Sequence, residues 1–168
     1  MMLSEENYHV DLEQAINQNA DMIYRIAVTI TGNRADAEDV FQETFLRLVK
    51  YQDKIQSEEH LKAWLIRVAS NCAKTIVTNS WNRKTQGITE ELEEKGQMKE
   101  LFVPSLVTEL QQLPSKYSLA LYLYYYEGYS VKEISLLLEK KENSVKTLLN
   151  RGRHLLRKRL EEGGYGNE

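Results

Sequence analysis

The sequence predicts an all-α protein built from two small helical units joined by a flexible linker. Apolar residues recur at spacings of three, four and seven along most of the chain, which is typical of helices with one buried face. The β-branched residues fall at these helical positions instead of alternating as they would in strands. Only two prolines interrupt the pattern in 168 residues.

Residues 1–84 predict three helices. The first apolar stripe ends at Gly32, a residue suited to the left-handed position after a helix. Asn33 can cap the second helix, and Ser57 can cap the third. The apolar positions of the three helices are, in order, Leu12, Ile16, Ile23, Ile26, Ala27 and Ile30; Phe41, Phe45, Leu48 and Val49; and Trp64, Leu65, Val68, Ala69, Cys72 and Ile76.

Residues 85–112 differ in composition from both flanks and predict an acidic, flexible linker. They hold two glycines, one proline, and the four acids Glu90, Glu91, Glu93 and Glu94. The stretch 102–110 is expected to begin the next unit. Fully extended, the linker could span roughly 90 Å, so the two units could stand several DNA turns of ~34 Å apart.

Residues 113–168 predict a second helical unit. Its first helix runs through Leu119 and Tyr122 to Gly128, and its tyrosine-rich row is more typical of core rings than of a base-stacking platform. Ser130 and Glu133 then form the sequence pattern of a capping box. Two short amphipathic helices follow, with the polar break 139–142 between them, which is the pattern of a helix-turn-helix.

The second helix of this pair carries a dense basic face. Between Lys140 and Arg159 there are eight Lys or Arg residues and one acid, Glu142. A helix of this size and charge could enter the major groove of DNA. The alternative is a solvated helix whose basic residues complement the helix dipole.

The charge distribution suggests two kinds of partner. The net charge is −3 and the isoelectric point is about 5.7, which argues against a simple non-specific DNA binder. Residues 1–84 carry ten bases and twelve acids, 85–112 two and six, and 113–168 ten and seven. The C-terminal unit is therefore basic, whereas the rest of the chain is acidic.

The sequence offers no motif for catalysis, and we expect neither an enzyme nor a cofactor. His9, His60 and His154 lie far apart, without metal-ligand spacing, and no phosphate-binding loop or nucleophile elbow is found. Cys72 is the single cysteine and falls on an apolar stripe, so we expect a buried thiol in a reducing cytoplasm. No apolar run approaches the ~20 residues of a membrane span, and the polar N-terminus does not resemble a secretory signal.

The chain resembles the extracytoplasmic-function (ECF) group of bacterial RNA polymerase sigma factors, in the sigma-70 family. The matching stretches are YRIAVTITGNRADAEDVFQETFLRLVK and HLKAWLIRVASNCAK in the first unit, and LPSKYSLALYLYYYEGYSVKEISLLL and NSVKTLLNRGRHLLRKRL in the second. The resemblance covers nearly the whole chain. It implies a sigma region 2 domain over 1–84 and a sigma region 4 helix-turn-helix domain over 113–168.

The resemblance implies a polymerase-binding surface on the second helix. Asp39, Gln42 and Glu43 stand three and four residues apart and so share one helix face, opposite Phe41 and Phe45. In the family this face docks on the clamp of the polymerase β′ subunit. The alternative is that these acids simply favour the positive end of the helix dipole.

The resemblance also implies that the third helix and the loop after it recognise the promoter −10 element and hold a base flipped out of the duplex. The family places an Asn that lines this pocket at Asn71. Trp81 could stack on a base or pack against the domain. The residues assigned to this surface are Arg67, Asn71, Lys74, Asn79, Trp81, Arg83 and Lys84.

The last helix is implied to read the −35 element. The candidate residues are Ser144, Lys146, Thr147, Asn150, Arg151 and Arg153. Arg151 is the first choice because a guanidinium can pair bidentately with guanine. The chain departs from the family pattern in having Glu139 in place of a turn glycine, Lys140 in place of an apolar residue, Lys141 in place of a capping Ser, and Leu148 in place of an Arg. We therefore expect Asn143 to cap the helix, and the backbone at Glu139 either to avoid positive φ or to bear strain.

The implied partners are core RNA polymerase, through its β′ clamp and β flap, together with promoter DNA and a candidate anti-sigma factor. The free protein is expected to be a cytoplasmic monomer with no membrane insertion. A different class of function, a dimeric helix-turn-helix repressor or activator, would use only the second half of the chain. In that case Asp39, Gln42, Glu43 and Asn71 would have no special role.

Overall fold

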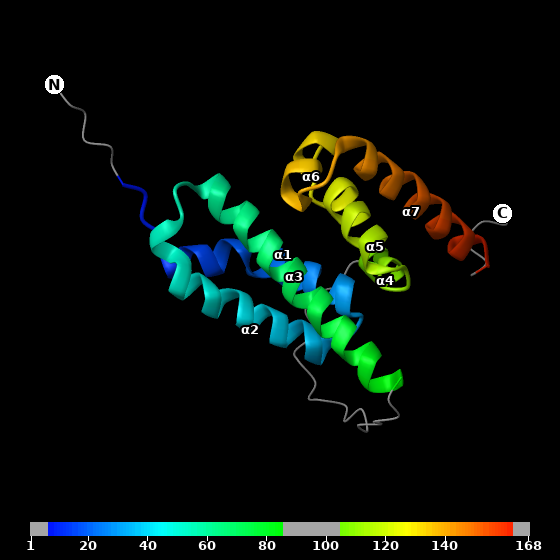
Figure 1. Cartoon of the computed structure of the whole chain (residues 1–168), viewed down its shortest axis with the longest axis horizontal. Helices are drawn as coiled ribbons and strands as arrows, with labels where there is room; N and C mark the ends of the chain where they lie inside the picture. The colour runs from blue at the N-terminus through cyan, green and yellow to red at the C-terminus, as the bar shows by residue number, and fades with distance from the viewer. Residues whose placement is uncertain (1–6, 86–104, 163–168) are drawn as a thin grey trace.

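The computed structural model describes residues 7–85 and 105–162, with side chains for 7–80 and 106–162 (Figure 1). The described residues form helices and no strands, which confirms the predicted fold class. The helices are α1 (Leu12–Thr31), α2 (Arg34–Tyr51), α3 (Glu58–Thr85), α4 (Ser105–Leu110), α5 (Ser115–Leu121), α6 (Val131–Leu138) and α7 (Glu142–Glu162). A 3₁₀ turn (Gln52–Lys54) follows α2, and a π-helical segment (Tyr122–Tyr126) follows α5.

Helices α1, α2 and α3 pack against one another and form the N-terminal unit, with the predicted caps in place. Gly32 ends α1 in the left-handed conformation, with φ of 73°. The side chain of Asn33 accepts a hydrogen bond from the backbone N–H of Asp36 and starts α2. Ser57 does the same for the N–H of His60 at the start of α3. Because the chain reverses sharply at each cap, the three helices lie side by side around one apolar core.

The buried face of α2 differs in part from the predicted one. Phe45 and Leu48 point into the core as expected, but Val49 is 48% exposed. Thr44 is fully buried, and its hydroxyl donates to the carbonyl of Val40. The prediction for Val49 was wrong because it assumed that only apolar residues fill the core. The hydrogen bond of the Thr44 hydroxyl within its own helix lets this threonine take the core position instead.

The C-terminal unit is built around α5 and α7. The two helices approach closely at Gly152, where an added Cβ would lie 3.0 Å from Leu121 Cδ1. Val145 and Leu149 on α7 and Ile134 on α6 fill the remaining core. The capping box predicted at the start of α6 is formed, because Ser130 and Glu133 each accept the other's backbone N–H.

Helix α4 lies inside the range predicted as linker. Its residues Val107 and Leu110 are fully buried, and the helix packs against α1. Helical structure therefore begins within the stretch 102–110, where the next unit was expected to begin, and this helix contacts α1 of the first unit. The remaining linker residues, 86–104, lie outside the described part of the chain.

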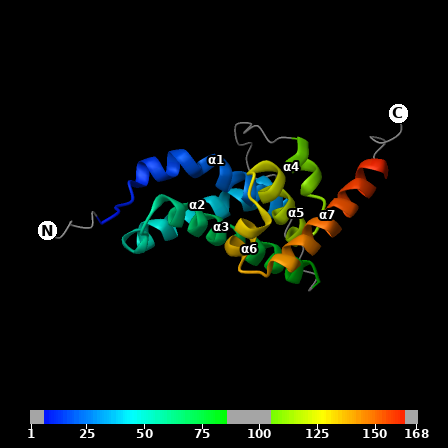
Figure 2. The ribbon, with the colours of Figure 1, turned by 90° about the horizontal axis from the view of Figure 1, so that it is seen from above.

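The two units contact each other directly. Helix α5 lies against α1, and α6 lies against α3, as Figure 2 shows. The two units are therefore not several DNA turns apart in this structure, although the length of the linker would allow that separation. Among the described helices, none is long and apolar enough to cross a membrane.

Candidate functional site

The exposed face of α2 carries the three residues assigned to polymerase binding. Asp39, Gln42 and Glu43 are all exposed, and Glu43 Oε1 accepts a hydrogen bond from Arg47 Nε at 2.8 Å. The exposed side chain of Leu46 lies on the same helix, as does Val49, at 60% and 48% exposure. The result is a surface that mixes acids with uncovered apolar groups, which is typical of a protein-docking face. The apolar part was missed in the sequence, where the spacing of Val49 assigned it to the core.

Helix α3 presents the residues assigned to the −10 element in different environments. Asn71 is exposed, and so is Asn79 near the end of the helix. Lys74 is half-buried, and burial, with a smaller contribution from the nearby Lys140, lowers the pKa of its ammonium group. The structure does not describe the side chains of Trp81, Arg83 and Lys84.

Arg67 is not directed to solvent. Its Nε donates to the carbonyl of Leu137 at 3.1 Å, and its Nη2 donates to the carbonyl of Leu136 at 3.3 Å. Both acceptors lie in the last turn of α6, in the other unit. The helical spacing in the sequence grouped Arg67 with Asn71 and Lys74, but it gave no sign of this contact between units.

Helix α7 displays most of the residues assigned to the −35 element. Five of them are exposed: Ser144, Lys146, Thr147, Asn150 and Arg151. Their amide, hydroxyl and cationic groups lie on the face opposite the buried Val145 and Leu149. This face has the donors and acceptors that base edges and phosphates require.

Arg153 is turned inward instead. Its guanidinium carbon lies 5.8 Å and 5.7 Å from the ring centroids of Tyr124 and Tyr125, and its Nη1 donates to Asn150 Oδ1 at 3.1 Å. Its Nε is buried and has no hydrogen-bond partner among the described residues. The sequence counts Arg153 among the exposed bases of α7, whereas the structure gives it aromatic neighbours.

The turn between α6 and α7 adopts the strained one of the two backbone alternatives that the sequence leaves open at Glu139. Glu139 ends α6 in the left-handed conformation, with φ of 53° and ψ of 46°. Ser135 fixes the turn, since its carbonyl accepts from the N–H of Lys140 and its hydroxyl donates to the Lys140 carbonyl at 2.6 Å. The predicted cap was wrong: α7 begins at Glu142, so Asn143 lies inside the first turn.

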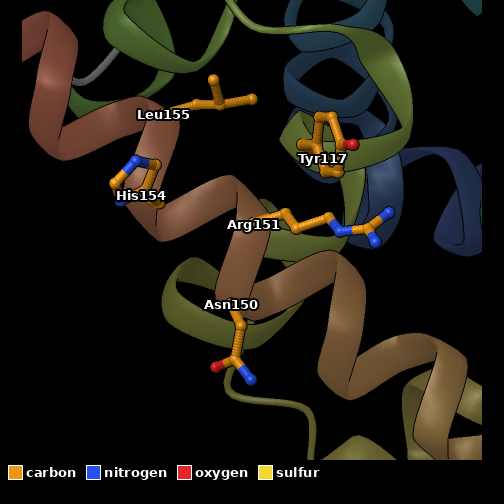
Figure 3. Close-up of a pocket in the computed structure, with 5 residues that line it drawn as sticks. All are labelled: Tyr117, Asn150, Arg151, His154 and Leu155. Atoms are coloured by element: carbon orange, nitrogen blue, oxygen red, sulfur yellow. The ribbon is translucent and has the colours of Figure 1, made fainter.

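A shallow cavity of about 370 Å³ lies beside α7, lined by Tyr117, Asn150, Arg151, His154 and Leu155 (Figure 3). Arg151 extends to the same side of α7 as Tyr117, while Asn150 and His154 point elsewhere. Arg151 therefore lies at the border between the exposed face of α7 and its contact with α5. Within residues 7–80 and 106–162, no cluster of His, Cys, Asp and Glu could hold a metal ion.

Known proteins resemble the chain over both units. Residues 15–83 match the family model of sigma-70 region 2, and residues 105–156 match that of sigma-70 region 4. The ECF RNA polymerase sigma factor SigM of Bacillus subtilis is 30% identical over 158 residues, covering 87% of this chain and 92% of SigM. SigW of the same species is 29% identical over 158 residues, covering 84% of each. SigE of Mycolicibacterium smegmatis is 29% identical over 154 residues, and the match covers 86% of this chain but 60% of SigE.

Two solved structures share the fold. The sigma factor RpoE in complex with the anti-sigma factor NepR, from Bartonella quintana, superposes with a TM-score of 0.71 at 20% identity, covering 90% of this chain and 97% of RpoE. CnrH in complex with the cytosolic domain of CnrY gives a TM-score of 0.65 at 17% identity, covering 90% and 88%.

Proposed function

Because the chain belongs to the ECF sigma factors of bacterial RNA polymerase, we propose that it recognises the −10 and −35 elements of its promoters and helps to open them. A sigma factor directs transcription as a non-catalytic subunit of the polymerase. On this proposal the protein works in the cytoplasm, is a monomer when free, and has no active site or cofactor.

The observation that carries the proposal is that two chemically different surfaces are displayed by one chain. The face of α2 is acidic and partly apolar, while the outer face of α7 is cationic and rich in hydrogen-bonding groups. The first suits a protein partner and the second suits duplex DNA. A repressor that binds DNA alone would need only the second surface.

We assign each surface one role. Residues 36–50 bind the β′ clamp of core polymerase through Asp39, Gln42 and Glu43. Residues 64–84 open the −10 region, with Asn71 in the base pocket, and residues 142–159 anchor on the −35 element, with Arg151 as the principal contact. The domains assigned to these roles are 1–84 and 113–168, joined by the linker 85–112, and the second domain also binds the β flap.

An anti-sigma factor is a further candidate partner. The two solved structures described above are both complexes, of RpoE with the anti-sigma factor NepR and of CnrH with the cytosolic domain of CnrY. Their sequence identity to this chain is 20% and 17%, so the partner of this chain is a proposal from its family and fold.

The test is multi-round transcription from a pool of randomised duplex promoters, using core polymerase with and without the protein. We expect transcripts only when the protein is present, from templates that share two spaced sequence elements. If no such transcripts appear, and the protein alone shifts palindromic duplex DNA as a dimer, the repressor alternative replaces the proposal.

Arg151→Ala tests the assignment of α7 within the same assay. We expect it to lower promoter-specific transcription by roughly five- to a hundredfold, the value of one good base contact, while binding to core polymerase is unchanged. Lys132→Ala is the matched control, because it removes an exposed cation of the same unit that lies on α6, outside residues 142–159. Loss of core binding in Arg151→Ala would contradict the assignment.

A further inference from the structure

The inward position of Arg153 is the feature of α7 that a direct role in DNA binding leaves unexplained. Arg153 belongs to the basic helix but is half-buried, whereas Lys146 and Arg151 on the same helix are exposed. Its Nε is buried and has no hydrogen-bond partner among the described residues. A guanidinium that gives up water for such a position needs other contacts that hold it there.

Two aromatic rings supply part of that support. Tyr124 and Tyr125 lie edge to face, with ring centroids 5.0 Å apart and ring planes at 77°. The guanidinium carbon of Arg153 lies 5.8 Å and 5.7 Å from these centroids, within the range of a cation–π contact. Both tyrosines belong to the π-helical segment Tyr122–Tyr126, and π-helical turns often occur at functional sites. The wide turn therefore provides the rings against which Arg153 rests.

The guanidinium in turn fixes the amide group of Asn150. Arg153 Nη1 donates to Asn150 Oδ1 at 3.1 Å. Because an arginine side chain has donors and no acceptor, it cannot pair with the NH₂ group of the amide. The oxygen must therefore face Arg153, and the NH₂ group forms the free edge of the exposed Asn150 side chain. Figure 3 shows this side chain directed away from Tyr117 and from the contact of α7 with α5.

An amide held in this way reads bases differently from one that can turn. A freely turning asparagine pairs best with adenine, because its oxygen accepts from N6 while its NH₂ group donates to N7. In the major groove guanine offers two acceptors, thymine offers the acceptor O4, and cytosine offers the donor N4. A side chain that presents its NH₂ group alone therefore favours guanine or thymine and disfavours cytosine.

We propose that Arg153 is a positioning residue that sets the base preference of Asn150. Supported by Tyr124 and Tyr125, its guanidinium keeps the amide oxygen away from the groove, so that Asn150 meets DNA as a hydrogen-bond donor. The inference rests on the proposed role of α7 in reading duplex DNA. It assigns a guanine or a thymine to the position of the −35 element that Asn150 contacts.

The test uses the full chain and a pool of duplex DNA with a randomised segment, with and without core polymerase. Bound DNA is separated and sequenced, and the base preference at each position is compared between variants. Asn150→Ala locates the position that Asn150 reads, because the preference is lost there. Arg153→Met keeps a long side chain against the rings but removes every donor, whereas Arg153→Lys keeps a donor for Asn150 Oδ1.

Two further variants change no residue of α7. Tyr125→Ala removes an exposed ring that supports the guanidinium, so it tests the same support by a second route. Lys116→Ala is the matched control, because it removes an exposed cation of the same unit that lies 4.9 Å from the centroid of the Tyr117 ring. Circular dichroism checks that each variant keeps its helices.

We expect wild-type protein and Lys116→Ala to select guanine or thymine at the position that Asn150 reads. Arg153→Met should raise the share of adenine there roughly fivefold or more, the value of one bidentate base contact, because the released amide can turn. Tyr125→Ala should shift the preference in the same direction. Arg153→Lys should retain the wild-type preference.

Three results would overturn the inference. In the first, Asn150→Ala alters the preference at no position, which would make Asn150 a phosphate contact. In the second, the wild-type protein selects adenine or cytosine at the position that Asn150 reads. In the third, the folded Arg153→Met and Tyr125→Ala variants both keep the wild-type preference.

The proposed function and this inference can fail separately. If the protein supports promoter-specific transcription while Arg153→Met keeps the wild-type preference, the inference fails and the function stands. If no promoter-specific transcription occurs, but the protein alone selects duplex DNA with the expected dependence on Arg153, the inference stands and the function fails. Selection of no sequence, with or without polymerase, contradicts both.

Discussion

At the scale of single residues, the most constrained position is Glu139. It is the one non-glycine residue with positive φ among those the structure describes. A side chain in the left-handed region costs roughly 1–2 kcal/mol, because Cβ approaches the following carbonyl. The double use of Ser135 in hydrogen bonds to Lys140 shows how the turn holds this conformation.

Glu139→Gly is expected to stabilise the protein by about 0.5–1 kcal/mol, because the relief of strain exceeds the entropy that glycine costs in the unfolded chain. Denaturant unfolding followed by circular dichroism measures the change. Lys141→Gly is the control, since Lys141 lies two residues further along the turn and does not have positive φ. Equal destabilisation by both substitutions would mean that Glu139 is not strained.

Arg153→Ala is expected to act mainly on stability. The guanidinium lies against the rings of Tyr124 and Tyr125 and bonds to Asn150. Its removal should lower the free energy of unfolding by roughly 1–2 kcal/mol, through lost cation–π contact and packing. The DNA affinity of the protein that remains folded should change little. A drop in affinity as large as that of Arg151→Ala, with unfolding unaffected, would place Arg153 on the DNA surface instead.

At the scale of elements, the sequence predicted the helices well because their caps and apolar stripes are local signals. Gly32, Asn33 and Ser57 mark helix ends by chemistry that depends on only a few neighbouring residues. The errors arose where tertiary contacts decide. Val49 is apolar yet exposed, and α4, which lies where the next unit was expected to begin, packs against α1 of the first unit.

The residues of the candidate site were predictable to the same extent as the helices. The exposed positions on α2 and α7 follow from helical spacing, so most of the predicted residues lie on solvent-accessible faces. The positions of Arg67 and Arg153 do not follow from spacing, because their partners are 69 or more and 28 or more residues away in the chain. A periodic pattern identifies which side of a helix is polar, but not which other element meets it.

Asn71→Ala tests α3 as the element that captures an unpaired base. Asn71 is exposed on this helix, and its amide can donate to and accept from a base edge. The substitution should reduce transcription from a fully duplex promoter roughly tenfold or more, and less from the same promoter already unpaired at the −10 element, because the cost of flipping the base is then removed. Full activity on the duplex template would exclude Asn71 from the pocket. Glu59→Ala is the control on the exposed part of the same helix.

At the scale of the whole molecule, the arrangement of the two units determines which surfaces are available at the same time. The outer faces of α2 and α7 are exposed, whereas Arg67 of α3 donates to the carbonyls of Leu136 and Leu137 in the other unit. The candidate residues of α2 and α7 are therefore accessible at the same time, while Arg67 is hydrogen-bonded between the units.

Asp39→Arg combined with Glu43→Arg should abolish co-purification with core polymerase, because two acids on the docking face become cations and the ion pair of Glu43 with Arg47 is lost. Binding of the free protein to DNA should be kept. Asp53→Arg, an exposed acid outside α2, serves as the control for added positive charge. Unchanged co-purification by the double variant would show that this face is not the docking site.

The π-helical segment has a wider turn than an ordinary α-helix. Its wide turn is closed by the backbone N–H of Glu127 bonding to the carbonyl of Tyr122, five residues back, and the side chains of the same two residues are hydrogen-bonded as well. An α-helix advances about 100° per residue, so deleting one residue, such as the exposed Tyr125, would let the segment relax to α-helix with Glu127 four residues after Tyr122. Four such steps make about 400°, close to one full turn, so Glu127 would still face Tyr122 and Arg25. The wide turn therefore holds one residue more than an α-helix needs, and this segment can lose that residue without losing the contact to Arg25.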